Sequence, residues 1–234
     1  MKATVAEKRE VAKGTLLVTF TVEDYPEFRP GAYFWVELPN RGHDDDKGLR
    51  RHISLVTSPT ESGIVGLATR LRDSAFKQTL AELEVGDEVV VEEPKGSFLL
   101  PEDTSETYVF VAGGIGITVF RSMLRYIRDT EAPYEITLVY SNRDRESAAF
   151  LEEVEQLERE LPGLRLVLTM TDEDGWDGET RRIDAAMLRD HLGALDRYRY
   201  LVAGPPPMTE AVVAELHGGG VPEDRVLADK FSGY

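Results

Sequence analysis

The sequence contains no cysteine and only four histidines. The missing cysteines exclude disulfides, cysteine-ligated iron–sulfur clusters, thiolate zinc sites and cysteine nucleophiles from this chain. The histidines are scattered without an HxxxH spacing, so no metal site is predicted. The sequence also lacks an apolar run of about 18 residues, and its charged first ten residues lack the apolar core of a signal peptide. A cytoplasmic location without membrane insertion is therefore the expectation.

Lysine is scarce as well, with 7 lysines against 20 arginines, and the net charge is −16. A chain of this charge repels nucleic acid and anionic membranes, so neither is an expected partner. Two explanations fit the composition. One is an acidic surface suited to a high-salt cytoplasm, where charges are strongly screened. The other is an ordinary acidic protein from an arginine-rich proteome.

The first hundred residues are predicted to form a small antiparallel β-barrel. Short runs rich in β-branched and aromatic residues, separated by turn signals, are typical of strands. They span 15–22, 33–38, 52–57, 64–71 and 88–93, and one helix is predicted over 76–84. Several short strands with one helix favour a barrel. The loop 40–48 holds three consecutive aspartates and is expected to be a solvated tip, with a cation site as the alternative.

From about residue 104, strands alternate with helices. Strands are predicted at 107–113, 135–141, 164–170, 198–204 and near 225–228, with helices at 117–129, 147–160, 184–192 and 207–217. This alternation implies a parallel sheet with helices on both faces. The polar, proline-containing stretch 99–107 is the predicted boundary. The predicted fold is an antiparallel β-barrel domain, residues 1–103, followed by an α/β Rossmann-like parallel-sheet domain, residues 104–234.

The stretch "VFVAGGIGITVF" ends a buried strand in three glycines, Gly113, Gly114 and Gly116. Glycine costs roughly 0.5–1 kcal/mol relative to alanine inside regular structure, so a close approach to the backbone is expected there. The helix that begins near Ile117 offers free N–H groups to an anion such as a dinucleotide pyrophosphate. Thr118 can cap this helix or bond a phosphate oxygen. A tight strand–helix turn without a ligand is the alternative.

Two later strand ends fall at the same edge of the predicted sheet. "YSNRD" (140–144) places Asn142 and Arg143 where a ribose or 2′-phosphate would lie, and Arg143 or Arg145 can pair with such a phosphate or remain a surface charge. "VAGPPPM" (202–208) supplies Gly204, Pro205 and Met208 for a rigid wall beside a planar ring; a bare helix entry is the alternative.

The stretch "RRHISLVTS" (50–58) is the most informative part of the first domain. Because side chains alternate along a strand, Arg51 and Ile53 face one way and His52 and Ser54 the other. Arginine suits diphosphate recognition, and a serine hydroxyl can donate to a ring nitrogen. Without context, an arginine and a serine in a strand are equally ordinary.

Six ordered motifs resemble the ferredoxin–NADP reductase family over nearly the whole chain. They are "RPGAYFWVEL" (29–38), "RHIS" (51–54), which resembles the RxYS flavin motif, "EPKGSFLL" (93–100), "GGIGIT" (113–118), "GPPPM" (204–208) and "DKFSGY" (229–234). The resemblance implies a flavin-binding barrel followed by a domain that binds NADPH or NADH. FAD is preferred over FMN because a second anion site, at 74–79, fits a dinucleotide.

The resemblance also implies roles for individual residues. Arg51 would contact the flavin pyrophosphate, with His52 and Ile53 beside it, and Ser54 would bond near flavin N5. The strand end Ala68, Thr69 and Arg70 would line the other side of the flavin. Ser74, Phe76, Lys77 and Gln78 would belong to the helix N-terminus that faces the diphosphate. Tyr234 would shield the ring, with a frayed tail as the alternative and Phe231 as the competing stacking residue.

Three departures from the family pattern stand out. Ile53 replaces the usual tyrosine of RxYS, so stacking on that ring face is lost or replaced by aliphatic contact. Ala203 replaces the cysteine that usually precedes the GP segment, and Val119 replaces a frequent proline.

The implied reaction is hydride transfer from the nicotinamide to the flavin, and then electron transfer to a separate acceptor such as ferredoxin or flavodoxin. Arg121, Arg125 and Arg128 offer a possible docking patch for such an acidic partner, or a solvated helix face. The alternatives are a flavin, ferric or quinone reductase with a diffusible acceptor, and a non-catalytic flavin-binding protein that only transfers electrons.

Overall fold

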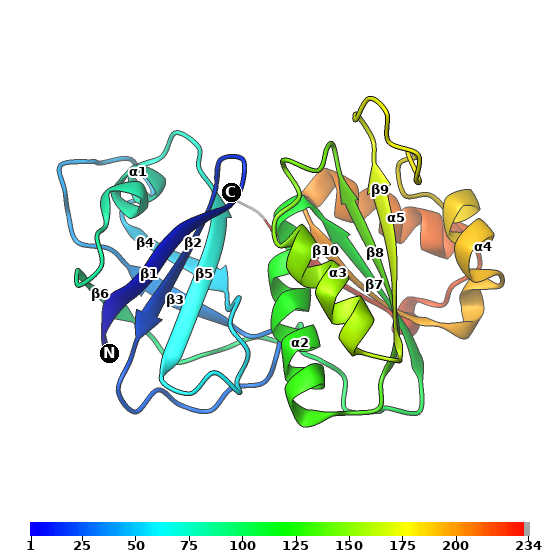
Figure 1. The fold of residues 1–234 in the computed structure, drawn as a ribbon, viewed down its shortest axis with the longest axis horizontal. Helices are drawn as coiled ribbons and strands as arrows, with labels where there is room; N and C mark the ends of the chain where they lie inside the picture. The colour runs from blue at the N-terminus through cyan, green and yellow to red at the C-terminus, as the bar shows by residue number, and fades with distance from the viewer. Residues whose placement is uncertain (232–234) are drawn as a thin grey trace.

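A six-stranded antiparallel sheet forms the first half of the chain in a computed structural model that describes residues 1–231 (Figure 1). Its strands are β1 (Lys2–Ala12), β2 (Thr15–Thr21), β3 (Tyr33–Glu37), β4 (Arg50–Ser54), β5 (Ile64–Arg70) and β6 (Glu88–Val91), in the order β4-β3-β6-β1-β2-β5. The two edges approach each other, since the N–H of Val56 donates to the carbonyl of Gly66 at 3.0 Å. The sheet therefore curls into a barrel, as predicted.

Helix α1 (Ala75–Glu82) covers one end of this barrel. Its apolar residues Phe76 and Leu80, with Leu83 after it, pack with the inward residues of the strands in one buried cluster. Burial of this apolar surface holds the helix in place, at about 25 cal/mol for each Å² removed from water.

A five-stranded parallel sheet forms the second half. Its strands are β7 (Thr107–Gly113), β8 (Glu135–Asn142), β9 (Leu164–Met170), β10 (Arg199–Gly204) and β11 (Val226–Lys230), in the order β11-β10-β7-β8-β9. Strand order reverses between β7 and β10, which is the point where ligands bind in open α/β sheets. The carboxyl ends of the strands point to the top of Figure 1.

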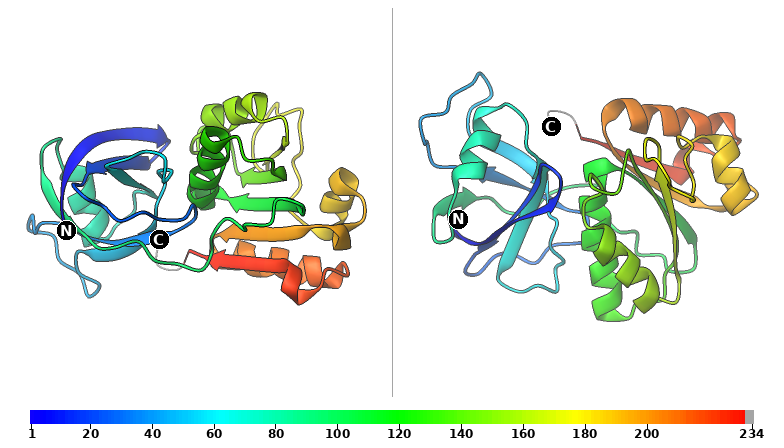
Figure 2. Two further views of the ribbon diagram at one scale, coloured as in Figure 1. Left: turned by 90° about the horizontal axis from the view of Figure 1, so that it is seen from below. Right: turned by 45° about the horizontal axis from the view of Figure 1, so that its top comes forward.

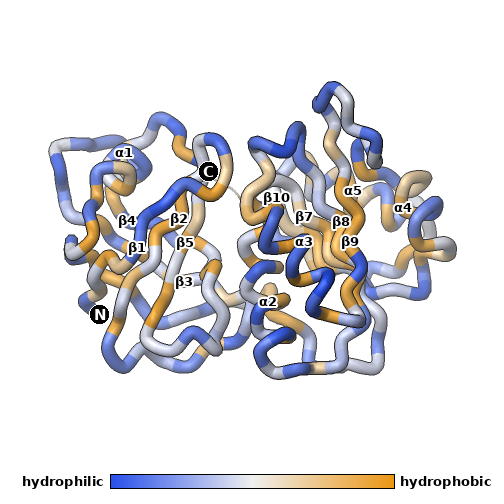
Figure 3. The backbone as a smooth tube through the Cα atoms, viewed as in Figure 1, coloured by the Kyte–Doolittle hydropathy of each residue, from blue (hydrophilic) through white to orange (hydrophobic). Residues whose placement is uncertain are grey.

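Helices cover both faces of this sheet, as predicted (Figure 2). On one face α2 (Ile117–Thr130) and α3 (Leu151–Glu160) bury alternate residues such as Tyr108 and Phe110. On the other face α4 (Ala185–Leu192) and α5 (Pro206–Gly218) bury Val109 and Val111. The apolar strands lie inside and the polar loops outside, which Figure 3 shows as orange and blue segments. No helix within residues 1–231 is both long and apolar enough to span a bilayer.

Helix α2 joins the two domains. The buried guanidinium of Arg121 donates to the carbonyl of Val56 at 2.7 Å, and the hydroxyl of Ser122 donates to the carbonyl of Thr57, also at 2.7 Å. Met123 lies against Gly31 of the barrel, where a Cβ atom would meet the methionine Cε at 2.5 Å. The apolar cluster under α2 also includes Val56 of the first domain. The domain interface is therefore part of a continuous core.

Three expectations about the elements were wrong. The longest strand, β1, was not predicted, because only Ala3 and Val5 are buried near its start and its second half is charged. Strand β4 ends at Ser54 instead of residue 57. Helix α3 begins at Leu151 instead of 147, because the N–H of Ser147 donates to the carboxylate of Asp144 in a turn. The predicted boundary at 103/104 falls in the connection between β6 and β7 and stays a prediction.

Candidate functional site

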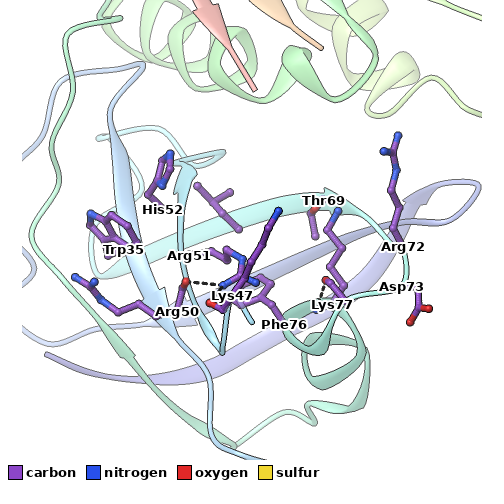
Figure 4. A pocket seen from close by; sticks show the side chains of 12 residues that line it. Trp35, Lys47, Arg50, Arg51, His52, Thr69, Arg72, Asp73, Phe76 and Lys77 are labelled. Atoms are coloured by element: carbon purple, nitrogen blue, oxygen red, sulfur yellow. Dashed lines mark hydrogen bonds between the residues drawn. The ribbon is translucent and has the colours of Figure 1, made fainter. Parts of the chain in front are cut away.

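A cavity of about 740 Å³, the barrel pocket, lies between β4, the end of β5 and the start of α1 (Figure 4). Seven of the predicted site residues line it: Arg51, His52, Ile53, Thr69, Ser74, Phe76 and Lys77. Sequence reasoning missed five further lining residues, Trp35, Lys47, Arg50, Arg72 and Asp73. Its wall has five basic side chains and one acid, although the chain carries a net charge of −16.

Arg51 is held at the wall of the barrel pocket. One guanidinium nitrogen donates to the carbonyls of Lys47 at 2.6 Å and Arg50 at 2.8 Å, and the guanidinium lies 5.6 Å from the Phe76 ring centroid. Its Nη2 atom is buried without a hydrogen-bond partner in the described chain, and lies 3.6 Å from a carboxylate oxygen of Asp45. A buried cationic donor of this kind suits a diphosphate oxygen.

Lys77 lies in the first turn of α1 and is 6% exposed. Burial, together with the positive charges of Arg72 and Arg51, lowers the pKa of its ammonium group to about 8. A bound anion would oppose this shift, since it supplies a negative charge where cations gather. The donor set of the barrel pocket therefore fits a flavin diphosphate.

The side of β4 that is expected to face a flavin ring differs from the family pattern in a way that the sequence indicated only in part. Ile53 borders the pocket, yet it is 4% exposed and packs in the barrel core. The exposed aromatic side chain is its neighbour His52, whose ring lies 5.0 Å from that of Trp35 and 5.6 Å from that of Tyr33. The predicted aliphatic contact of Ile53 with the flavin stays a prediction.

A second cavity of about 440 Å³, the sheet-edge pocket, lies at the carboxyl edge of the parallel sheet, where β7 and β10 diverge. It brings together seven predicted residues: Arg70, Gly113, Gly114, Asn142, Arg143, Pro205 and Met208. Sequence reasoning missed Ser141, Thr171, Arg182, Ile183, Pro207, Ala211 and Val212. Thr171 directly follows β9, and that strand end was the signal that could have found it, whereas Arg182 and Ile183 lie further along the loop before α4 and had no such signal.

Each of the three glycines in the turn is needed for a different physical reason. A Cβ atom on Gly116 would lie 2.2 Å from the carbonyl oxygen of Ala203, so this glycine lets the turn pack on β10. A Cβ on Gly113 would lie 2.7 Å from the sulfur of Met208. Gly114 has a φ of +52°, which disfavours other residues, and its face is open except for Arg70. The close approach expected from a ligand is thus made at Gly116 by the chain itself.

The polar groups around the sheet-edge pocket leave room for a ligand. Both amide atoms of Asn142 are buried without a hydrogen-bond partner in residues 1–231. The hydroxyl of Thr118 already donates to the carbonyl of Ile115 at 3.0 Å, so it closes the turn and caps no helix end. Burial of an unpaired amide is costly, and a nucleotide hydroxyl or phosphate would satisfy that of Asn142. The pocket therefore fits a nicotinamide dinucleotide.

The remaining predicted residues line neither pocket. They are Ser54, Ala68, Gln78, Gly116, Ile117, Thr118, Gly204 and Phe231. Ser54 is 6% exposed, and the Gln78 amide donates to Asp73 at 2.9 Å. Phe231 is buried in the α2 cluster. Tyr234 lies outside the described residues.

One hydrogen bond and one electrostatic interaction link the two domains near the pockets. The guanidinium of Arg70 in β5 donates to the carbonyl of Ser147 at 3.1 Å. Burial raises the pKa of Asp229 in β11, and the charge of His52 in β4 opposes this shift. Arg70 of the barrel therefore contacts the loop between β8 and α3 of the second domain beside the sheet-edge pocket.

The α2 arginines do not form the predicted docking patch. Arg121 is 4% exposed and bonds Glu153 at 2.9 Å, and Arg125 pairs with Glu61 and Glu153, each at 3.4 Å. Arg128 pairs with Asp129 at 2.6 Å. These side chains serve the domain interface and the helix surface.

Comparison with known proteins agrees with this geometry. Residues 110–214 match the oxidoreductase NAD-binding domain family. A component of the Na(+)-translocating NADH-quinone reductase of Neisseria meningitidis serogroup C is 26% identical over 90% of this chain and 62% of the relative. The chain thus spans less than two thirds of the length of such relatives.

Solved structures match over nearly the whole chain. The ferredoxin reductase of a carbazole 1,9a-dioxygenase is 25% identical, with a TM-score of 0.83 over 99% of this chain and 69% of that one. A ferredoxin NADP+ reductase from Neisseria gonorrhoeae with bound FAD and NADP has the same fold at 17% identity, with a TM-score of 0.82 over 98% of each chain. Residues 110–214 thus form an oxidoreductase NAD-binding domain, and the two-domain fold with its two pockets is that of ferredoxin–NADP reductase-like proteins that bind FAD and NAD(P)H.

Proposed function

We propose that this chain oxidises NAD(P)H with FAD held in the barrel pocket and passes the electrons to a separate acceptor. The observation that carries the proposal is the meeting of the two pockets at the end of β5. Thr69 lines the barrel pocket, and the next residue, Arg70, lines the sheet-edge pocket. Two cavities, one in each domain, therefore both reach the end of β5.

The chain's own residues bind and orient in this proposal. Arg51, Lys77 and the first turn of α1 hold the diphosphate, and the wall of β4 positions the ring. A flavin, when bound, accepts a hydride from nicotinamide and releases electrons to an acceptor. Ser54 remains our candidate for a hydrogen bond near flavin N5. The continuous core under α2 fixes the position of one pocket relative to the other. This matters because hydride transfer tolerates little misplacement of the reacting groups.

For the coenzyme we propose that the sheet-edge pocket accepts the 2′-phosphate of NADPH. Arg143 and Arg182 both line the pocket, and no hydrogen bond or ion pair within residues 1–231 engages either guanidinium. Arg145, the alternative, is paired with Glu173. Asp144, which would repel a phosphate, accepts from the N–H of Ser147 at 2.8 Å instead.

The coenzyme proposal is tested by steady-state kinetics. Arg143→Ala and Arg182→Ala should each raise the Michaelis constant for NADPH about tenfold, as expected for one charge-assisted bond, and leave that for NADH unchanged. Arg145→Ala is the matched control, because its charge is neutralised by Glu173. Equal effects on both coenzymes would refute 2′-phosphate recognition.

The acceptor we favour is a one-electron protein such as ferredoxin or flavodoxin. A diffusible acceptor is the second candidate, and the ion pairing of the α2 arginines favours it, because these side chains are not free to dock an acidic partner. Turnover with ferredoxin, flavodoxin, free FMN, ferric chelates and a water-soluble quinone separates the two. A strong preference for free flavin or a chelate would defeat the first.

The main experiment is an absorbance spectrum of the purified protein after reconstitution with FAD. We expect a yellow protein whose visible flavin bands bleach when NADPH or NADH is added anaerobically. Arg51→Ala should weaken FAD retention. Protein that binds no flavin would refute the function, and flavin-loaded protein that neither coenzyme reduces would favour the non-catalytic alternative.

A further inference from the structure

The three-aspartate loop 40–48 is largely exposed, as expected for a solvated tip, but Asp45 within it lies against α1. A carboxylate oxygen of Asp45 accepts from the N–H of Ala75, the first residue of α1, at 2.8 Å. The neighbours Asp44 and Asp46 are exposed, whereas Asp45 is half-buried, with 29% of its side chain accessible. Within the described residues, these aspartates do not gather with other ligands into a metal site. Asp45 therefore plays a different part from its two neighbours.

The same carboxylate also faces Arg51. Its second oxygen lies 3.6 Å from Nη2 of Arg51, and the carbonyl of Lys47, two residues further along the loop, accepts from Nη1 at 2.6 Å. These contacts, led by the N–H of Ala75, lower the pKa of Asp45, so the group is ionised at neutral pH. The loop thus lies against Arg51, which lines the barrel pocket, and its carboxylate occupies the first N–H of α1 beside that pocket.

The rest of the loop is fastened independently of that pocket. Arg41 forms an ion pair with Asp87 at 2.5 Å, and the ring of His43 lies 2.8 Å from a carboxylate oxygen of Glu82 at the end of α1. The loop therefore lies along α1 with its first half anchored away from the pocket. Its second half can leave the donors while the first half stays bound.

We infer that Asp45 is an internal competitor of the flavin diphosphate, occupying its donors when the barrel pocket is empty and giving them up when FAD binds. This inference rests on the proposed function of the barrel pocket. A carboxylate and a diphosphate need the same partners, namely a helix N-terminal N–H and an arginine fork. Because the carboxylate of Asp45 is attached to the chain, it competes at every FAD concentration. The apparent FAD affinity is the intrinsic affinity multiplied by the fraction of molecules in which Asp45 has left these donors.

The experiment measures dissociation constants by quenching of flavin fluorescence, for FAD and for riboflavin, which carries no phosphate. Asp45→Ala should tighten FAD binding by about threefold to tenfold, the range expected for one released hydrogen bond, and leave riboflavin binding unchanged. Asp46→Ala removes the same charge from the same loop and should leave both constants unchanged. Asp45→Asn retains an acceptor for the Ala75 N–H and should show a smaller gain, which guards against a folding defect in the alanine variant.

Each outcome has one meaning. Unchanged or weaker FAD binding in both Asp45 variants overturns the competitor role, and so does an equal gain in Asp46→Ala, which would reflect net charge alone. Arg51→Ala separates this result from the parent proposal. If Arg51→Ala weakens FAD binding while Asp45→Ala fails to tighten it, only the competitor role fails. If Arg51→Ala leaves FAD binding unchanged, the diphosphate site and the inference built on it both fail.

Discussion

Arg121 offers the sharpest test of how the two domains are held together. Its side chain is 5% exposed, donates to the carbonyl of Val56 and to Glu153, and lies 4.8 Å from the ring centroid of Phe150. Replacing it with methionine keeps most of the apolar contact. The replacement leaves the Val56 carbonyl without its donor and leaves Glu153 only the longer pairing with Arg125 at 3.4 Å.

The magnitude follows from these contacts. Two bonds from a charged donor contribute about 1.5–3 kcal/mol each, and the cation–π contact about 0.5–2 kcal/mol. Against this, burying the guanidinium is unfavourable, and burial lowers its pKa accordingly. Breaking a buried pair costs about 3–5 kcal/mol, and the 26% exposure of Glu153 reduces this value. We expect Arg121→Met to lower the free energy of unfolding by about 2–4 kcal/mol.

Urea unfolding followed by circular dichroism measures this loss. Arg125→Ala is the control: its side chain is 21% exposed and pairs only at 3.4 Å, so its loss should stay below about 1 kcal/mol. The rate of flavin reduction, measured by stopped flow, should also fall in Arg121→Met, because the two pockets are no longer held in a fixed relative position. A loss below about 1 kcal/mol, or a loss equal to that of Arg125→Ala, would refute the reasoning.

Two further predictions concern the pockets. Gly116→Ala should lower the free energy of unfolding by at least about 3 kcal/mol or abolish soluble expression, because the new Cβ would lie 2.2 Å from the Ala203 carbonyl oxygen. Gly218→Ala, which has open space around the new Cβ, is the control and should change the free energy of unfolding by less than about 0.5 kcal/mol. Equal effects of the two substitutions would contradict the packing role of Gly116. FAD affinity should fall several-fold as the pH rises above about 8, because the ammonium of Lys77 attracts the diphosphate below this pKa and is neutral above it. The FAD affinity of Lys77→Met should not change over the same pH range. An equally steep fall in the affinity of this variant would show that another group is responsible.

The sequence predicted the architecture well because the second domain obeys strong local rules. Strands β7 and β9 have the predicted limits, since runs such as "TYVFVAG" are buried on both faces and therefore apolar throughout. Strand β1 escaped prediction because its charged second half carries no period of two that a buried face would impose. Its place in the barrel is decided by pairing with β2 and β6, which local sequence does not encode.

The candidate site was predictable where a recognisable motif marks it and not elsewhere. Gly114 and Arg51 lie in recognisable motifs and line the pockets. Arg182 and Asp45 lie in loops whose path depends on tertiary contacts, so their positions emerged only from the structure. The glycine turn shows a subtler limit: the sequence indicated a close approach, but the atom that approaches Gly116 belongs to the neighbouring strand.

Helix α2 carries the glycine turn at its first residue and the bonds to Val56 and Thr57 one turn later. The same helix therefore fixes the spacing of the barrel pocket and the sheet-edge pocket, together with Phe98 and Leu100 of the β6–β7 connection, which are buried in the same apolar cluster. Under the proposed function, a tilt of α2 would move the two pockets apart and slow the reduction of bound flavin.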